Sequence, residues 1–202
     1  MAGMTNALGY DAAVDFYEED EPADQVLDMA YRPPMLEAVE PVSVLDVAAA
    51  FLRKFGQLDT YKLQKLCYYA QAQHLAMYDT RLFKEPILAW PNGPVVKELF
   101  ARHAGKYEVD ATVRLGDADR VLQQNAAADT LEFVGDRYGF LKGQELSELT
   151  HREQPWRDAR VGLRARELGA HEIPIEILRD YYRQLEPPEA VDDPGDWWQS
   201  ST

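Results

Sequence analysis

The sequence predicts a mainly α protein: a single compact helical domain with a small β-ribbon, flanked by acidic tails. Apolar residues recur at helical spacing in several segments, most clearly between residues 61 and 78. Residues suited to helix starts precede these segments. Residues 1–40 carry ten acidic side chains and one basic one, and residues 185–202 carry five acidic and no basic ones, so the net charge of −14 lies at the two ends. We expect an acidic extension over 1–41, a helical body over 42–185 and an acidic tail over 186–202.

The first two helices of the body have clear capping signals. Ser43 precedes an apolar helical face with Asp46 in its first turn, and Gly56 suits the residue after the last turn. Asp59 and Thr60 cap the next helix, expected over about 61–78. Apolar and aromatic side chains surround this second helix, which predicts a central helix buried on more than one side.

A β-ribbon follows, because Leu82–Phe83 and Ile87–Trp90 are short apolar runs typical of strands. The turn Pro91–Pro94 comes next, with Pro94 at the first position of a helix that extends to about His103. A further strand is predicted over Glu108–Leu115.

The remaining body reads as helices separated by short breaks. Asp129 and Thr130 cap a helix that ends at Gly139, another runs to Thr150, and Pro174 starts the last one. His151–Trp156 is read as a linker, with Trp156 packed into the core ahead of a helix over 156–167. A short apolar helix over 23–31 is either an extra support for the core or a partner-binding element.

No pattern of catalytic or metal-binding residues stands out. The four histidines and the lone Cys67 lack zinc-ligand spacing, and Cys67 among apolar neighbours is expected to be inert. His74 is read as a core histidine. Asn92-Gly93-Pro94 is read as a tight turn, with an anion site at a helix start as the alternative. We expect no enzyme activity, no cofactor and no metal, against the alternative of a hydrolase with a carboxylate-bound metal.

Two regions are candidates for partner binding. In the acidic extension these are the charged run Glu18, Glu19, Asp20 and Glu21 and the apolar Leu27 and Tyr31, against the alternative of solvated tails. On the central helix, Lys62, Lys65 and Tyr69 are read as an exposed edge that binds a partner or is an ordinary helix shoulder.

The charge and hydropathy patterns also bear on location and partners. An acidic chain disfavours direct nucleic-acid binding, including the role of a DNA autorepressor. No apolar run is long enough to span a bilayer, and the acidic first 30 residues do not resemble a secretory signal. We expect a cytoplasmic protein.

Several motifs resemble the Panacea antitoxin domain, the family of SocA-like and phage-associated GepA proteins. They are Lys65–Gln71, Leu82–Phe83 with Glu85, Ala89–Val95, Leu146–His151 with Pro155–Trp156, and Ile173–Pro174 with Tyr181–Tyr182. The similarity covers about Val42 to Leu185.

The resemblance implies a helical domain that neutralises a cognate protein toxin encoded beside it. We expect neutralisation by direct binding. The alternative is a proteolytic adaptor that delivers the toxin to a ClpXP-type protease. No catalytic residues carry over from this family. The recurring family elements are interpreted as structural: Leu66, Tyr68, Trp90, Gly93, Pro94, His151 and Trp156.

Overall fold

The computed structural model describes residues 41–185, and the predicted helix over 23–31 lies outside this range. Within it the chain forms eight helices and two small antiparallel strand pairs, which confirms the mainly α class. The elements are α1 (Val44–Phe55), β1 (Leu58–Asp59), α2 (Thr60–Tyr78), β2 (Ile87–Trp90), β3 (Gly93–Val96), α3 (Lys97–His103), β4 (Glu108–Val109), α4 (Ala118–Leu122), α5 (Asn125–Tyr138), α6 (Gly143–Arg152), α7 (Gln154–Ala159) and α8 (Ile175–Gln184).

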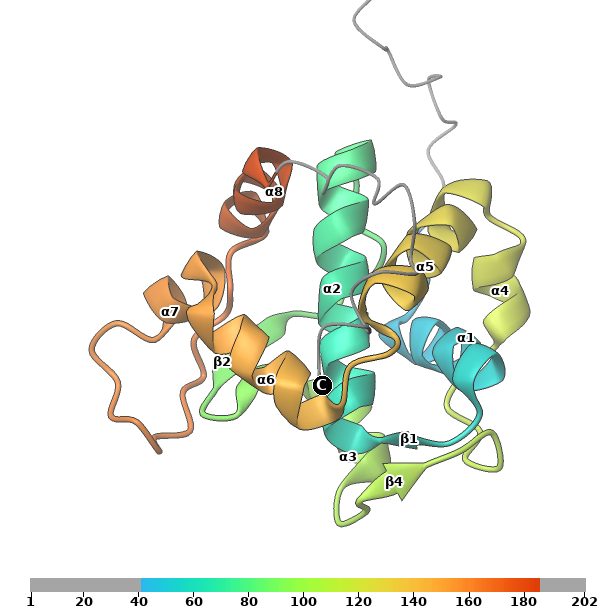
Figure 1. The fold of residues 1–202 in the computed structure, drawn as a ribbon, viewed down its shortest axis with the longest axis horizontal. Coiled ribbons are helices and arrows are strands. Elements are labelled where there is room, and N and C mark those ends of the chain that lie inside the picture. The colour runs from blue at the N-terminus through green and yellow to red at the C-terminus, as the bar shows by residue number, and fades with distance from the viewer. Residues whose placement is uncertain (1–40, 186–202) are drawn as a thin grey trace, which may run out of the picture. The chain divides into compact units, whose positions relative to one another are not determined.

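Helix α2 is the centre of the fold, as its sequence predicts. Figure 1 shows α2 between α6, α7 and α8 on one side and α1, α4 and α5 on the other. It packs most extensively against α5, α6 and α8. Asp59 caps it by accepting a hydrogen bond from the Lys62 N–H at 2.8 Å. Because most of its residues are buried, α2 is a core element rather than a surface helix.

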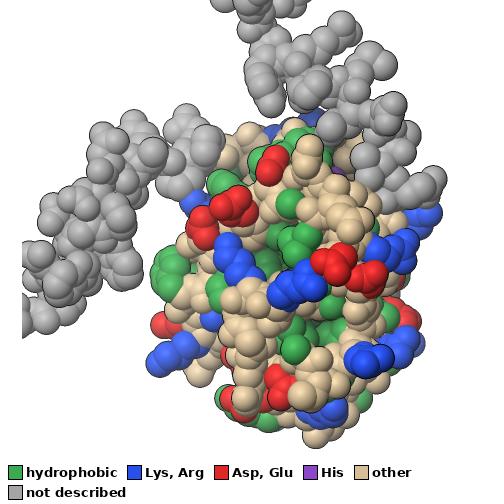
Figure 2. All heavy atoms as spheres, turned by 90° about the vertical axis from the view of Figure 1, so that its right-hand side faces the viewer, with side chains coloured by type: hydrophobic (Ala, Val, Ile, Leu, Met, Phe, Trp, Pro, Cys, Tyr) green, Lys and Arg blue, Asp and Glu red, His purple; other side chains and the backbone are tan. Residues whose placement is uncertain are grey.

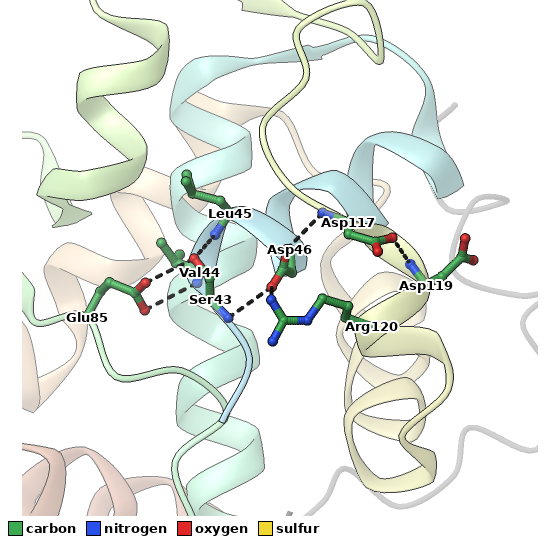
Figure 3. A network of polar contacts seen from close by, with 8 residues as sticks. All are labelled: Ser43, Val44, Leu45, Asp46, Glu85, Asp117, Asp119 and Arg120. Atoms are coloured by element: carbon green, nitrogen blue, oxygen red, sulfur yellow. Dashed lines mark hydrogen bonds and ion pairs between the residues drawn. The ribbon is translucent and has the colours of Figure 1, made fainter. Parts of the chain in front are cut away.

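The start of α1 is held by two carboxylates, one of them distant in sequence (Figure 3). Ser43 caps the helix as predicted, and together with Asp46 it forms a capping box. The Ser43 hydroxyl and the Val44 N–H donate to Glu85. Buried Asp46 also accepts from the Asp117 N–H at 2.8 Å and pairs with Arg120. Thus α1 is fixed both to the segment before β2 and to α4.

The prediction that Pro94 starts a helix is wrong, because Pro94 lies in β3 of a hairpin. Trp90 pairs with Gly93 across a two-residue loop, and the pairing continues to Ile87 with Val96. Both backbone groups of Val96 bond the side chain of Gln64 on α2, at 2.9 and 3.3 Å. These bonds hold the extended conformation through Val96, so α3 begins only at Lys97.

Other boundaries also differ from the predicted ones. The strand expected over Glu108–Leu115 is confined to Glu108–Val109, paired with β1, and α5 begins at Asn125, four residues before Asp129. The segment 151–156 is mostly helical, and α7 ends at Ala159. The Arg160 guanidinium accounts for that end, because it donates to the carbonyls of residues 89, 164, 165 and 167 and so folds residues 160–167 into a loop.

The last described segment closes onto the hairpin. The Ala89 N–H donates to the His171 carbonyl at 2.9 Å, and the Ile173 N–H donates to the Ile87 carbonyl at 2.8 Å. Strand β2 is therefore bonded on both edges. Helix α8 follows from Pro174 as predicted and buries Leu178 and Tyr182 in the core.

The surface on the side of α1, α4 and α5 mixes both signs of charge. Figure 2 shows basic and acidic side chains interspersed there with apolar ones. Arg53 pairs with Asp119 at 2.5 Å and Lys54 with Asp136 at 3.1 Å across that region. Such exposed pairs contribute little to stability, so this surface is not what holds the fold together.

Candidate functional site

Two charged side chains, Lys65 and Glu153, are buried where a core would be expected to be apolar, and they lie in different surroundings. Lys65 comes from the first half of α2 and is 1% exposed. Glu153 lies between α6 and α7 and is 7% exposed. Buried charges are normally paired, so the partners of these two groups indicate what each does.

Lys65 has one hydrogen-bond acceptor and no ion pair among the described residues. Its Nζ donates to the Pro94 carbonyl at 3.2 Å. The same ammonium lies 5.9 Å from the centre of the Tyr61 ring. Burial lowers the pKa of Lys65 to about 7, opposed by the more distant Asp59 carboxylate. An ammonium has three donors, so two of those of Lys65 are free for another acceptor.

The hairpin makes room for Lys65 by placing glycine beside it. Gly93 has φ +102°, and a Cβ there would lie 2.5 Å from the Lys65 Cε and 2.9 Å from the Thr150 Oγ1. Any side chain at 93 would therefore be strained and would displace the lysine. Gly93 is predicted to be structural, and the structure shows that it lets the hairpin backbone approach α2.

A cavity of about 640 Å³ opens beside Lys65, and we call it the Lys65 cavity. Its floor includes Gln64 and His103, whose side-chain nitrogens are 3.0 Å apart. Burial lowers the pKa of His103, which favours the neutral ring. The complete lining is Thr60, Tyr61, Gln64, Lys65, Trp90, Pro91, Asn92, Val95, Phe100, His103, Gly105, Lys106, Arg166 and Leu168.

A second cavity of about 740 Å³ adjoins it, and we call it the Tyr107 cavity. The two share Tyr61 and Asn92, which are joined by a hydrogen bond of 3.1 Å from the Asn92 amide to the tyrosine hydroxyl. Its lining is more polar and carries both signs of charge: Gln57, Leu58, Asp59, Tyr61, Lys62, Asn92, Tyr107, Glu108, Lys142, Gly143, Gln144, Ser147, Glu148 and His151.

Glu153, in contrast, is fully bonded. Its carboxylate accepts hydrogen bonds from the hydroxyls of Tyr68 at 3.1 Å, Tyr69 at 3.0 Å and Tyr182 at 2.8 Å. Burial raises the pKa of Glu153 to about 7, although the three hydroxyls act against the rise. Tyr138 stacks on Tyr69 with ring centres 4.0 Å apart. This cluster connects α2, α8 and the α6–α7 junction, so the role of Glu153 is structural.

Trp156 and His151 lie between the two regions. Trp156 is only half-buried, so the prediction that it fills the core is met in part: it packs on the core edge and donates to the Trp90 carbonyl at 3.0 Å. Its ring stacks on His151 at 4.2 Å. The His151 Nε2 is buried without a partner in the described structure, and burial and the nearby Lys65 lower its pKa.

The predicted exposed edge of the central helix is wrong for two of its three residues. Lys65 and Tyr69 are buried, because α5, α6, α8 and the hairpin enclose α2 on all sides there. Lys62 is partly exposed, but its Nζ donates to the Gly139 carbonyl at 2.6 Å. The exposed aromatic residue of that turn is Tyr61, at 42%. The candidates in the extension lie outside the described residues: Glu18, Glu19, Asp20, Glu21, Leu27 and Tyr31.

Of the remaining predicted motif residues, three are buried, and Trp90 is partly buried in the wall of the Lys65 cavity. Leu66 and Tyr68 are fully buried, Pro94 is buried in β3, and Trp90 meets Phe100 edge to face at 4.9 Å. Sequence reasoning did not identify the Lys65 cavity or the role of Glu153. The local signal was the Lys-Leu-x-Tyr-Tyr run on a helix that is predicted to be buried on more than one side.

Two reactive side chains are enclosed as predicted. Cys67 is fully buried, and burial raises the pKa of its thiol well above the ordinary value. His74 bonds the Thr130 hydroxyl at 2.9 Å, and burial lowers its pKa to about 4. Across residues 41–185, no three His, Cys, Asp or Glu side chains gather in a way that would hold a metal ion.

Comparison with known proteins supplies one match. No helix among residues 41–185 is long and apolar enough to cross a membrane. Neither the curated proteins nor the solved structures include a match to this chain. The resemblance stated from the sequence is confirmed over the segment from the first turn of α2 into α7: residues 63–157 match the family described as antitoxin SocA-like, Panacea domain.

Proposed function

We propose that this protein is a cytoplasmic antitoxin that neutralises a cognate protein toxin by binding it directly, with no catalytic step. The observation that carries the proposal is the match to the SocA-like Panacea domain over residues 63–157. That segment contains α2 from Leu63 onward, the whole β2–β3 hairpin and helices α3 to α6, and it supplies most of the residues that line the two cavities.

The Tyr107 cavity is the described surface best suited to a protein partner. Tyr107 is 74% exposed and Tyr61 42% exposed. Around them lie Lys62 and Lys142 together with Asp59, Glu108 and Glu148. Exposed aromatic side chains ringed by charges of both signs are typical of non-obligate protein interfaces. We propose that the toxin contacts this surface and that Glu18–Glu21 guide its approach.

The test is growth rescue on co-expression with the small protein encoded by the neighbouring reading frame. Tyr107→Ser should weaken rescue because it removes an exposed aromatic contact. Val161→Ser is the matched control, since Val161 is 75% exposed and lines neither cavity. A second, full-length variant changes Glu18, Glu19 and Glu21 to Gln and Asp20 to Asn. Its complex with the toxin should form more slowly than that of the unchanged chain, and the difference in rate should be larger at low salt than at high salt.

Equal rescue by Tyr107→Ser, Val161→Ser and the unchanged chain would reject the proposed surface. Failure of the unchanged chain to rescue growth or to capture the neighbouring protein would reject the function itself.

The adaptor alternative is separated by the fate of the toxin. Direct blocking predicts undiminished neutralisation in cells that lack the ClpXP-type protease, with the toxin accumulating in the complex. Loss of neutralisation in those cells, with a longer toxin half-life, would indicate delivery for degradation instead.

A further inference from the structure

The Lys65 cavity has a charge that the rest of the chain does not share. Its lining contains three cationic residues, Lys65, Lys106 and Arg166, and no Asp or Glu among the described residues. The net charge of −14 lies in residues 1–40 and 185–202, so the body around the cavity is neutral overall. A concave site lined by one sign of charge concentrates its field, so this cavity favours anions.

The deepest of the three cations has unused hydrogen-bonding capacity. Lys65 is 1% exposed and has a single acceptor, the Pro94 carbonyl. Glycine at position 93 leaves room for the lysine side chain itself, because a Cβ there would lie 2.9 Å from its Nζ. Burying an ammonium without a carboxylate is costly, and an anion entering the cavity would satisfy the two remaining donors.

The walls of the cavity are flat and apolar. Tyr61, Trp90 and Phe100 supply three aromatic rings, with Trp90 and Phe100 packed edge to face. The hydrogen bond from Asn92 fixes the Tyr61 hydroxyl. Val95 and Leu168 complete the apolar part. Such walls bury a planar ring favourably, and the volume of about 640 Å³ falls among those of small-molecule sites.

We propose that the Lys65 cavity binds a small organic anion that carries a planar ring, with its phosphate or carboxylate group at Lys65 and its ring against Tyr61, Trp90 and Phe100. Lys106 and Arg166 add positive charge at the same cavity. This ligand site adjoins the proposed toxin contact at the Tyr107 cavity, with which it shares Tyr61 and Asn92, but the proposal does not depend on the antitoxin function.

The first experiment is calorimetric titration of the purified full-length protein. The probes are the four nucleoside 5′-monophosphates and indole-3-acetate, which separate a phosphate from a carboxylate source. Two half-probes serve as controls: inorganic phosphate is an anion without a ring, and adenosine is a ring without an anionic group. At least one ring-bearing anion should bind with a Kd below about 1 mM, and both half-probes at least about tenfold more weakly. Binding of none of the five, or equal binding of phosphate alone, would overturn the proposal.

Variants then test the assigned residues. Lys65→Met keeps the aliphatic stem without the charge and should weaken binding by at least about tenfold. Arg166→Gln should weaken it several-fold. Arg164→Gln is the matched control, because it is an exposed change of the same charge in the same loop and lies outside the cavity lining. If Lys65→Met fails to fold, equal affinity of the Arg166 and Arg164 variants would overturn the site.

A proton balance gives a readout specific to Lys65. Because burial lowers its pKa, an anion binding at about pH 8 should draw a proton onto the amine. The other titratable or charged groups nearby are Asp59, Tyr61, His103, His151, Lys106 and Arg166. Titration in two buffers of different ionisation enthalpy should show proton uptake in the unchanged chain and none in Lys65→Met. Equal proton uptake by the unchanged chain and by Lys65→Met would show that the anion binds at a group other than Lys65.

Discussion

Lys65 and Glu153 are buried ionisable groups in the same body, and their surroundings are opposite. Three tyrosine hydroxyls from two helices saturate the Glu153 carboxylate, and Glu153 lines neither the Lys65 cavity nor the Tyr107 cavity. A single carbonyl meets the Lys65 ammonium, and a cavity opens beside it. The comparison teaches that burial alone does not identify a binding group. The count of satisfied hydrogen bonds separates a structural charge from one that is open to a ligand.

The largest expected effect contrasts the two groups directly. Glu153→Ala should lower the free energy of unfolding by about 3–5 kcal/mol, because it leaves three buried hydroxyls without their acceptor. Lys65→Met should change it by less than about 1 kcal/mol, since the loss of one hydrogen bond is offset by removal of a buried charge. Urea unfolding measures both. If Lys65→Met lowers the free energy of unfolding more than Glu153→Ala does, Lys65 and not Glu153 is the structural charge.

Trp156 connects the surroundings of Glu153 to those of Lys65. It lies one turn after Glu153 and bonds the Trp90 carbonyl in the hairpin beside Lys65. Trp156→Ala should cost about 2–3 kcal/mol, less than a fully buried tryptophan because the ring is half-exposed. Trp156→Phe keeps the stacking on His151 and should cost less. A change below about 1 kcal/mol in Trp156→Ala, the range of exposed sites, would show that the ring does not support the hairpin.

The pH dependence of stability has opposite signs for the two groups. The pKa of Glu153 rises from 4.5 to about 7 on folding, so its contribution is present below pH 4.5 and is lost as the pH rises to about 7. The pKa of Lys65 falls from 10.5 to about 7, so its contribution is present above pH 10.5 and is lost as the pH falls to about 7.

Thermal unfolding from pH 4 to 10 measures this difference. Relative to the unchanged chain, Glu153→Gln should remove the loss of stability between pH 4.5 and 7, and Lys65→Met should remove the gain above pH 7. Curves for the two variants that stay parallel to that of the unchanged chain would show that neither group titrates as its surroundings indicate.

The limits of sequence reasoning follow from the same contrast. Local signals located α1, α2 and α8, because Ser43, Asp59 and Pro174 act on backbone groups within one turn. Lys65 was read as exposed, because a lysine beside an apolar face usually extends into water. Its burial depends on Gly93 and Pro94, which only hairpin pairing brings to α2. Glu153 gathers tyrosines from positions 68, 69 and 182, and no local pattern links such distant residues.

The two edges of β2 have a practical consequence for anyone who shortens or recombines this protein. The family match stops at residue 157, yet the backbone groups of Ile87 and Ala89 are bonded by residues 171–173, and Tyr182 supplies one of the hydroxyls on Glu153. A fragment cut at the family limits would carry an open strand edge and an incomplete buried cluster, which invites pairing between copies. Chimaeras that exchange this domain between proteins should therefore be joined outside Val42 and Leu185.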